Sequence, residues 1–465
     1  MLQRNARQNG RKYIVLDKAN KTEMMLNAPV EKLIIKLAIP TIITMVITNI
    51  YNLVDTAFIG TINTAASGAV GIIFGFMAII QAMGFLFGQG SGSIVSRSLG
   101  QGDVKDASVT ASSGFFSAVL AGLVITVLGF IFMDPIVYFF GSTDTIAPYA
   151  KTYLRYILIA APGMTGCFAL NNLLRFEGMA LNGMIGMLSG AILNIGGDAL
   201  FIFKFNMGIA GAGLSTCISQ YISFAILMYP FITGKTQVKV SPFNMDKNFR
   251  QYTHIMNTGL PSLIRQGLSS IATIILNNLA AGYGDAAVAA MSIATRISFL
   301  AFSLALGIGQ GFQPVCGFNY GAKKYDRLRH AFKFTIGLAE VVMSVFLIFM
   351  FIFSEDLVAL FRDDPDVIII GTRALRAQCI GMILLPVVSV GEMMFQSSGN
   401  TRFATTLSLL RNGLLFIPAL FILSSLRGLY GIEEAQPVAY ILSYPIGIGM
   451  IIYFLIHLPN ESKSN

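Results

Sequence analysis

The amino-acid sequence predicts an all-α polytopic membrane protein: twelve transmembrane helices in two six-helix bundles, related by a pseudo-two-fold axis along the membrane normal. Charged residues make up only 12% of the 465 residues and hydrophobic residues 54%, with a mean hydropathy of +0.69, whereas soluble domains are about a quarter charged. Long apolar runs recur along the chain, and the chain aligns with itself at a shift of 221 residues. This composition excludes an ordinary soluble enzyme, a disordered chain and a nucleic-acid-binding protein.

Twelve apolar runs are long enough to cross the hydrocarbon core as helices, which need about 20 residues. Helices are expected because lipid cannot satisfy an exposed backbone. None of the runs alternates with a period of two, as the shorter strands of a membrane barrel would. The expected spans are 33–58, 65–95, 107–133, 146–174, 182–203, 208–232, 255–281, 286–318, 328–353, 367–396, 403–425 and 436–458.

The cysteines and histidines indicate neither a disulfide framework nor a metal site. All four cysteines fall inside apolar runs, where free thiols behave as small buried hydrophobes. The three histidines lie near the ends of such runs and have no partner at ligand spacing. The basic, polar stretch from Met1 to Lys36 lacks the short apolar core and the cleavage site of a signal peptide.

The positions of the basic residues predict the orientation in the membrane. Most Lys and Arg residues fall in the N-terminal arm, the even-numbered loops and the C-terminal tail. The opposite face holds only Lys151, Lys204, Arg362 and Arg427, together with many acids. The positive-inside rule therefore predicts a multi-pass protein of the cell membrane (the inner membrane of a bacterium) with cytoplasmic N- and C-termini. The net charge of +9 mostly reflects this surplus of basic residues on the side that is predicted to be cytoplasmic.

The internal repeat predicts two lobes inserted in the same direction. At the 221-residue shift Pro40 meets Pro261, Gly100 meets Gly321 and Gly178 meets Gly399. We expect a first lobe over 1–232, a cytoplasmic linker over 233–254 and a second lobe over 255–465. Parallel lobes around a cleft favour alternating access by rocking. The alternative, a duplicated structural bundle, leaves the acids within the membrane unexplained.

Two acids of the first lobe predict a cation or proton site. A charge at the bilayer centre costs about 2.5–3.5 kcal/mol and marks a functional hypothesis. Asp55 and Asp198 both lie late in outward-running spans, and Asn194 shares a helix face with Asp198. Thr216 and Tyr153 fall at a comparable depth. These oxygens can hold a shared proton or Na+, and no other metal or cofactor is expected.

The second lobe does not repeat the acidic site. At the 221-residue shift Asp55 meets Leu276, with Asn277 beside it. The lobe instead carries Arg265, Arg296 and Arg411 at middle depth, with Glu340 and Glu392 as expected partners, because an unpaired intramembrane charge is costly. The candidate substrate-cavity residues are Glu392, Arg411, Gln310 and Asn277.

Nucleotide use is not expected. Gly234-Lys235-Thr236 ends like a phosphate-binding loop, but Tyr229 stands where that motif needs glycine. The chain also has no soluble domain to hold a nucleotide. The spans have no interior histidine, so an intramembrane enzyme that uses paired His and Glu is not supported. We expect no enzymatic activity, no nucleic-acid partner, and a monomer that acts on small molecules in the bilayer.

Four groups of residues recur as motifs along the first half: Pro40 with Tyr51-Asn52-Leu53-Val54-Asp55, Gly88-Gln89-Gly90 with Arg97-x-Leu99-Gly100, Asn171-Asn172-x-x-Arg175-x-Glu177-Gly178, and Leu193-Asn194-x-x-x-Asp198. Together they resemble the multidrug and toxic compound extrusion (MATE) family of secondary transporters, in particular its DinF-like branch. The resemblance runs from about Leu33 to Leu458. It implies two bundles arranged in a V, and a first-lobe cation site of Asp55, Asn194, Asp198 and Thr216 with Tyr153 and Asn171 in its hydrogen-bond network.

The expected function is export of amphipathic, often cationic drugs or metabolites in exchange for H+ or Na+. An alternative is a lipid-linked precursor flippase of the same superfamily, which commonly has more helices and a strongly basic cavity. A second alternative is a major-facilitator transporter, but Arg97-Ser98-Leu99-Gly100-Gln101-Gly102-Asp103 lacks the acidic-basic signature of its second loop.

Overall fold

The computed structural model describes residues 21–459, apart from the side chains of residues 52 and 53, and all regular structure in this range is helical. The predicted fold class is confirmed. The first half contains α2 (Val30–Gly60), α3 (Thr64–Gly100), α4 (Val104–Ile131), α6 (Ala147–Phe176), α7 (Ala180–Asp198) and α8 (Ile209–Ile232). The second half contains α9 (Phe249–Ala281), α10 (Asp285–Gly321), α11 (Tyr325–Ile352), α13 (Pro365–Gly381), α14 (Leu385–Ser398), α15 (Thr401–Leu409), α16 (Phe416–Arg427) and α17 (Leu429–His457).

Twelve membrane crossings can be assigned within the described residues. Ten helices are long and apolar enough to cross a membrane, and α13 with α14 forms one more crossing that bends by 56°. The twelfth is α9, whose 33 residues span about 50 Å. It is less apolar because Gln266, Ser269, Ser270 and Thr273 line cavities inside the protein. Its polar residues therefore need not face lipid.

Several helix ends follow from local sequence. The side chains of Asn63, Asp103 and Asn248 accept hydrogen bonds from backbone N–H groups in the first turns of α3, α4 and α9, which satisfies donors that a helix start leaves open. Because Asn248 caps α9, this helix begins before the predicted span at 255. Gly178 and Gly399, which the repeat aligns, have φ angles of 81° and 86°, a conformation that favours glycine.

The sequence did not predict the short helices α5 (Met133–Phe139) and α12 (Ser354–Ala359). Both are too short for a search based on membrane-spanning length. Their starting points are 221 residues apart, so the repeat extends to these surface elements. Two π-helical segments, Ala199–Lys204 after α7 and Leu410–Leu414 between α15 and α16, were also missed.

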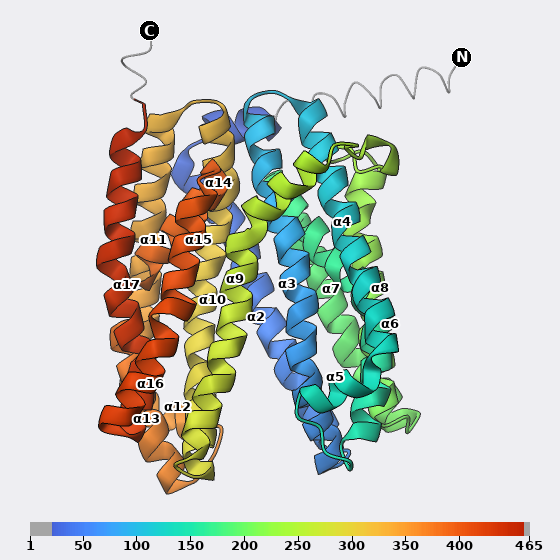
Figure 1. Cartoon of the computed structure of the whole chain (residues 1–465). Coiled ribbons are helices and arrows are strands. Elements are labelled where there is room, and N and C mark those ends of the chain that lie inside the picture. Colours follow the sequence, from blue (N-terminus) through green and yellow to red (C-terminus); the bar gives the residue numbers. More distant parts are fainter. Residues whose placement is uncertain (1–20, 460–465) are drawn as a thin grey trace.

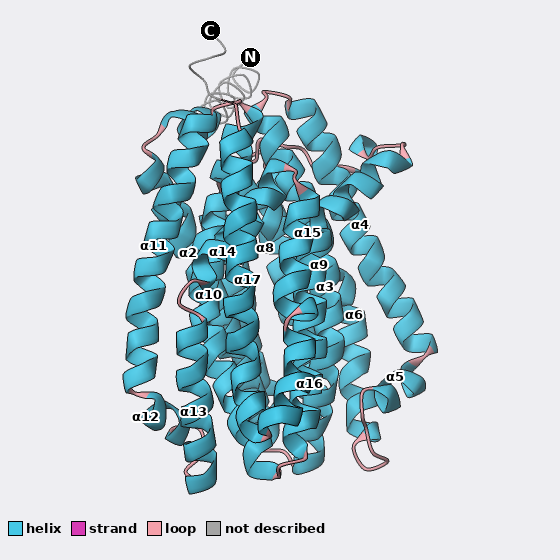
Figure 2. Ribbon diagram, turned by 60° about the vertical axis from the view of Figure 1, so that its left-hand side comes forward, coloured by secondary structure: helices cyan, strands magenta, loops and turns pink. Residues whose placement is uncertain are grey.

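The two halves converge at one end of the molecule and spread apart at the other (Figure 1). The helices run from end to end, and most loops gather at the two ends (Figure 2). Between the halves, α3 packs along α9 and α2 along α10. We call the end where α2 begins and α17 ends the closed end and the opposite end the open end. The basic N-terminal arm (1–20) and the C-terminal residues 460–465 lie outside the described residues, so part of the orientation prediction cannot be placed.

Glycines allow the backbones of the two halves to touch toward the closed end. A Cβ atom at Gly259 of α9 would overlap the backbone oxygen of Leu86 in α3, and one at Gly90 would overlap the backbone oxygen of Ile255. A Cβ atom at Gly311 of α10 would lie 2.6 Å from the backbone nitrogen of Ala38 in α2. Small residues permit this close helix packing in membranes.

Candidate functional site

The acidic residues of the first half meet in one buried cluster near the open end. Asp55 comes from α2, Tyr153 from α6 and Asp198 from the end of α7, and all three are at most 3% exposed. The Tyr153 hydroxyl donates to Asp55 Oδ2 at 3.5 Å. The carboxyl groups of Asp55 and Asp198 lie beside each other, close enough to interact directly.

Asn194 joins this cluster to α8. It lies one turn before Asp198, and its Nδ2 group donates to Thr216 Oγ1 at 3.2 Å and to Ser215 Oγ at 3.4 Å. The Ser215 hydroxyl donates to the backbone oxygen of Asn194 at 2.9 Å. The structure therefore brings together Asp55, Tyr153, Asn194, Asp198 and Thr216, which the sequence had singled out.

Several acceptor oxygens of the cluster receive no hydrogen bond from the described side chains and backbone. They are both carboxyl oxygens of Asp198, Oδ1 of Asp55 and Oδ1 of Asn194. A buried polar atom without a partner costs about 1–3 kcal/mol, and more when it is charged. The arrangement can accept positive charge, either as a proton shared by the two carboxyl groups or as a cation bound by several oxygens.

The structure does not bring Asn171 to this cluster. Its side-chain oxygen lies against Gly183, near the start of α7. Gly183 and Asp198 are 15 residues apart on one helix, or about 22 Å. The role implied for Asn171 by the resemblance is therefore wrong, because the residue lies near the closed end.

Glu392 of α14 is the centre of a buried ion-pair group in the second half. Its Oε1 atom accepts from Arg265 Nη1 at 2.8 Å and from the Ser408 hydroxyl at 2.6 Å. Arg411 Nη2 lies 3.6 Å from Oε2, and Arg411 Nη1 donates to Ser389 Oγ at 2.7 Å. The expected pairing of Glu392 is confirmed. Glu392 is enclosed by its partners, whereas Arg411 also borders a cavity.

Gln310 belongs to the contact between the halves and not to a substrate cavity. Its side-chain oxygen accepts a hydrogen bond from Arg175 of α6, which also reaches Gln313 at 3.3 Å. Gln313 in turn donates to Gln396 of α14 at 3.3 Å. Asn277 lines neither the cavity at Arg411 nor the pockets between the halves. Placing Gln310 in a substrate cavity was therefore wrong, whereas the role of Asn277 stays a prediction.

Sequence reasoning missed several polar residues beside these groups. Tyr51 lies one turn before Asp55 and within electrostatic reach of both acids. Its spacing of four residues could have revealed it. Ser215, Ser389 and Ser408 gave no comparable signal, because a single serine in an apolar helix commonly bonds to its own backbone.

Two pockets open between the halves. One, of about 600 Å³, lies between α3 and α9 and is lined by Gly71, Ile79, Gln266 and other residues. The other, of about 310 Å³, has Asn49 and Thr56 of α2 on one side and Arg296 and Phe299 of α10 on the other. Their lining residues lie toward the open end of α2, α3 and α10. The molecule is thus tightly packed at the closed end and hollow between its halves toward the open end.

Comparison with known proteins gives one consistent family. The MatE family model matches residues 40–200 and 261–422, and the two matches begin 221 residues apart, the same shift as the internal repeat. The chain is 27% identical over 429 residues to the multidrug export protein MepA of Staphylococcus aureus (strain MSSA476), covering 92% of this chain and 94% of the relative.

Solved structures agree over nearly the whole chain. An outward-facing multidrug resistance MATE family transporter of the MOP superfamily matches with a TM-score of 0.88 and 25% identity, covering 94% of this chain and 98% of that chain. A MOP superfamily transporter from Pyrococcus furiosus Vc1 (DSM3638), described as having a binding pocket of reverse polarity that suggests a different function, matches equally well. Membership of the DinF-like branch stays a prediction. The chain belongs to the MatE family of membrane transporters.

Proposed function

We propose that the protein is a secondary active antiporter that exports amphipathic, often cationic drugs or metabolites in exchange for H+ or Na+. The observation that carries this proposal is the buried cluster of Asp55, Asn194 and Asp198, in which four side-chain acceptor oxygens have no donor among the described side chains and backbone. Similarity to a multidrug export protein supports the substrate class. The protein would act as a monomer in the cell membrane, with both termini in the cytoplasm and without a nucleotide.

The geometry suggests how the exchange proceeds. The closed end is sealed by helix contacts, so a coupling ion would enter the buried cluster of Asp55 and Asp198 from the open end. Binding of positive charge removes the repulsion between the two carboxylates. The ion gradient drives the exchange, and a 100 mV potential adds about 2.3 kcal/mol for each net charge that the exchange moves inward. Rocking of the halves would then expose the cluster and the cleft to the cytoplasm, where the ion leaves and the next substrate binds.

The Asp55→Asn variant tests this proposal. An asparagine can still accept the hydrogen bond of Tyr153, so the protein is expected to fold, but the pair loses one ionisable group. In liposomes with an imposed tenfold H+ or Na+ gradient, one-for-one exchange can support about tenfold accumulation of a fluorescent cationic substrate, because this exchange moves no net charge and is driven by the ion gradient alone. The variant is expected to lose this gradient-driven transport.

Asp144→Asn is the matched control, because Asp144 is an exposed acid outside the cluster. It is expected to transport like the unmodified protein. Imposing the two gradients separately identifies the coupling ion. Unchanged coupling in the Asp55→Asn variant would show that this residue has no part in the mechanism and would contradict the proposal.

A further inference from the structure

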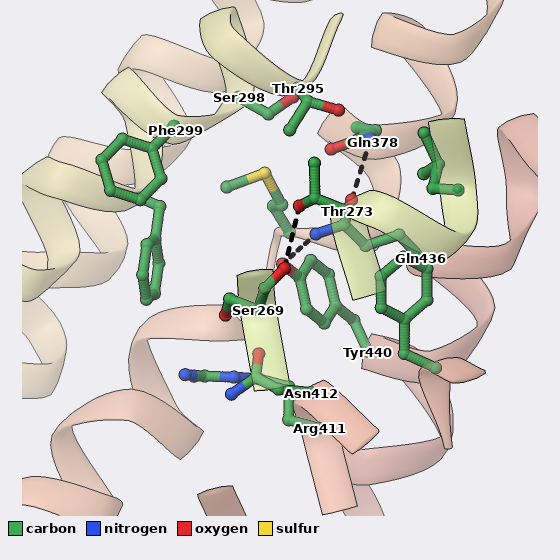
Figure 3. Close-up of a pocket in the computed structure, with 14 residues that line it drawn as sticks. Ser269, Thr273, Thr295, Ser298, Phe299, Gln378, Arg411, Asn412, Gln436 and Tyr440 are labelled. Carbon is green, nitrogen blue, oxygen red and sulfur yellow. Dashed lines mark hydrogen bonds between the residues drawn. The ribbon is translucent and has the colours of Figure 1, made fainter. Parts of the chain in front are cut away.

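The second half holds a small cavity, lined by polar and apolar side chains, that the cation cluster does not use. The cavity has a volume of about 100 Å³ and lies among α9, α10, α13, α17 and the π-helical segment that carries Arg411. In Figure 3, Arg411 lies at the bottom of the cavity, with Ser298 and Thr295 at the top and Gln378 at the side. A single water needs about 10–15 Å³ by the same measure, so the cavity has room for a small polar group.

The charge beside this cavity is not balanced. Arg265 and Arg411 share one carboxylate, that of Glu392, which leaves an excess of one positive charge among three buried side chains. Glu433, also buried in this half, pairs with Arg373, and Glu340 of α11 forms no ion pair with the described side chains. Arg411 has five N–H donors, more than its contacts with Ser389 and Glu392 use. A buried excess charge is costly, and an anion would offset it.

Hydroxyl groups without partners face the same space. Ser298 and Thr295 lie three residues apart on one face of α10, and neither hydroxyl has a hydrogen-bond partner in the described part of the chain. The side-chain oxygen of Gln378 is likewise unpaired there, although its nitrogen donates to Gln436 at 3.0 Å. Two hydroxyl donors and one arginine suit an anionic group, and the Gln378 oxygen can accept from a donor on the same molecule.

The cavity adjoins the cleft between the halves. Thr295 and Phe299 line both the cavity and the 310 Å³ pocket, and the exposed Arg296 lies in the wall of that pocket. Arg411 is also positioned over the ring of Phe302, 5.3 Å from its centre. A molecule that extends from the cleft into the cavity would therefore meet the positive charge of Arg296 and the ring of Phe299 first, and Phe302 and Arg411 farther in.

We propose that this cavity binds the carboxylate of an amphipathic organic acid or zwitterion that reaches it from the cleft. The two halves then have opposite preferences: the first binds the coupling cation between its acids, and the second binds an anionic group of the transported molecule at Arg411. This inference rests on the proposed transport function, which it extends by a second class of chemical group.

Binding of sodium benzoate to the purified protein in detergent tests this site without any transport. We expect the midpoint of thermal unfolding to rise with benzoate concentration and to saturate, relative to sodium chloride at equal ionic strength. The Arg411→Gln variant should bind benzoate about tenfold more weakly or worse, because a charge-assisted hydrogen bond is lost. The Arg376→Gln variant changes an exposed arginine outside the cavity. It should bind benzoate like the unmodified protein. The Asp55→Asn variant should lose coupled transport but still bind benzoate. Loss of coupling and loss of this binding site are therefore distinguished by the benzoate measurement.

A second variant decides the outcome if Arg411→Gln does not fold. Ser298→Ala removes a hydroxyl that has no partner within residues 21–459, so it should leave thermal stability unchanged without ligand and weaken benzoate binding about fivefold. Unchanged benzoate affinity in this variant would overturn the proposal. Equal stabilisation by chloride and benzoate would also overturn it, because the cavity would then hold a halide. The absence of any saturable effect would overturn it as well.

Discussion

Replacing Gly259 with alanine is expected to force the two halves apart at the closed end. The added methyl group would overlap the backbone oxygen of Leu86, and a backbone cannot move aside as the tip of a flexible side chain can. Overpacking a tight contact costs about 1–3 kcal/mol, enough to shift a balance between two states of the transporter that differ by a few kcal/mol. The variant should populate a state in which α3 and α9 separate at this level.

The distance between spin labels measures this change directly. Labels at the exposed residues Gln101 and Arg402, on a background without the four native cysteines, report the spacing of the halves. The Gly259→Ala variant should show longer or broader distances. Gly267→Ala is the matched control on the same helix, because nothing lies within 4 Å of the Cβ position there. Identical distance distributions for the two variants would show that the glycine contact does not hold the closed end together.

The helices and the acidic cluster were predictable because each depends on a rule that acts along the chain. A span must be apolar for about 20 residues, and a charge inside such a span is rare enough to stand out. The direction of each helix then gives its depth, which correctly placed Asp55, Asp198 and Thr216 near one another. The same reasoning failed for α5 and α12, which are seven and six residues long and therefore invisible to a search for spans.

The errors have a different origin. Asn171 was assigned from a resemblance alone, although its place near the end of α6 sets its depth and puts it far from Asp198. Gln310 lies between two glycines, a pattern that fits both a cavity wall and a tight helix contact. Only the position of the facing helix distinguishes these alternatives, and one residue pattern does not contain that information. The pairing of Glu392 was predictable because buried charges require partners, but Ser389 and Ser408 were not.

Replacing Glu392 with glutamine is expected to cause a large loss of stability, about 3–5 kcal/mol. Glu392 is 1% exposed and pairs with both Arg265 and Arg411. Removing one partner of a buried ion pair leaves uncompensated charge in a region of low dielectric constant. Here the net charge of the three side chains would rise from +1 to +2. Thermal unfolding of the purified protein in detergent would show the loss as a lower midpoint.

Two comparisons separate this effect from a general sensitivity to mutation. Glu434→Gln breaks the ion pair with Arg427 at the protein surface, and exposed pairs are worth about 0–1 kcal/mol, so the midpoint should hardly change. The double variant Glu392→Gln with Arg265→Gln restores the net charge to +1 and should be less destabilised than the sum of the two single variants. Additive losses would mean that packing, and not the balance of buried charge, determines stability around Glu392.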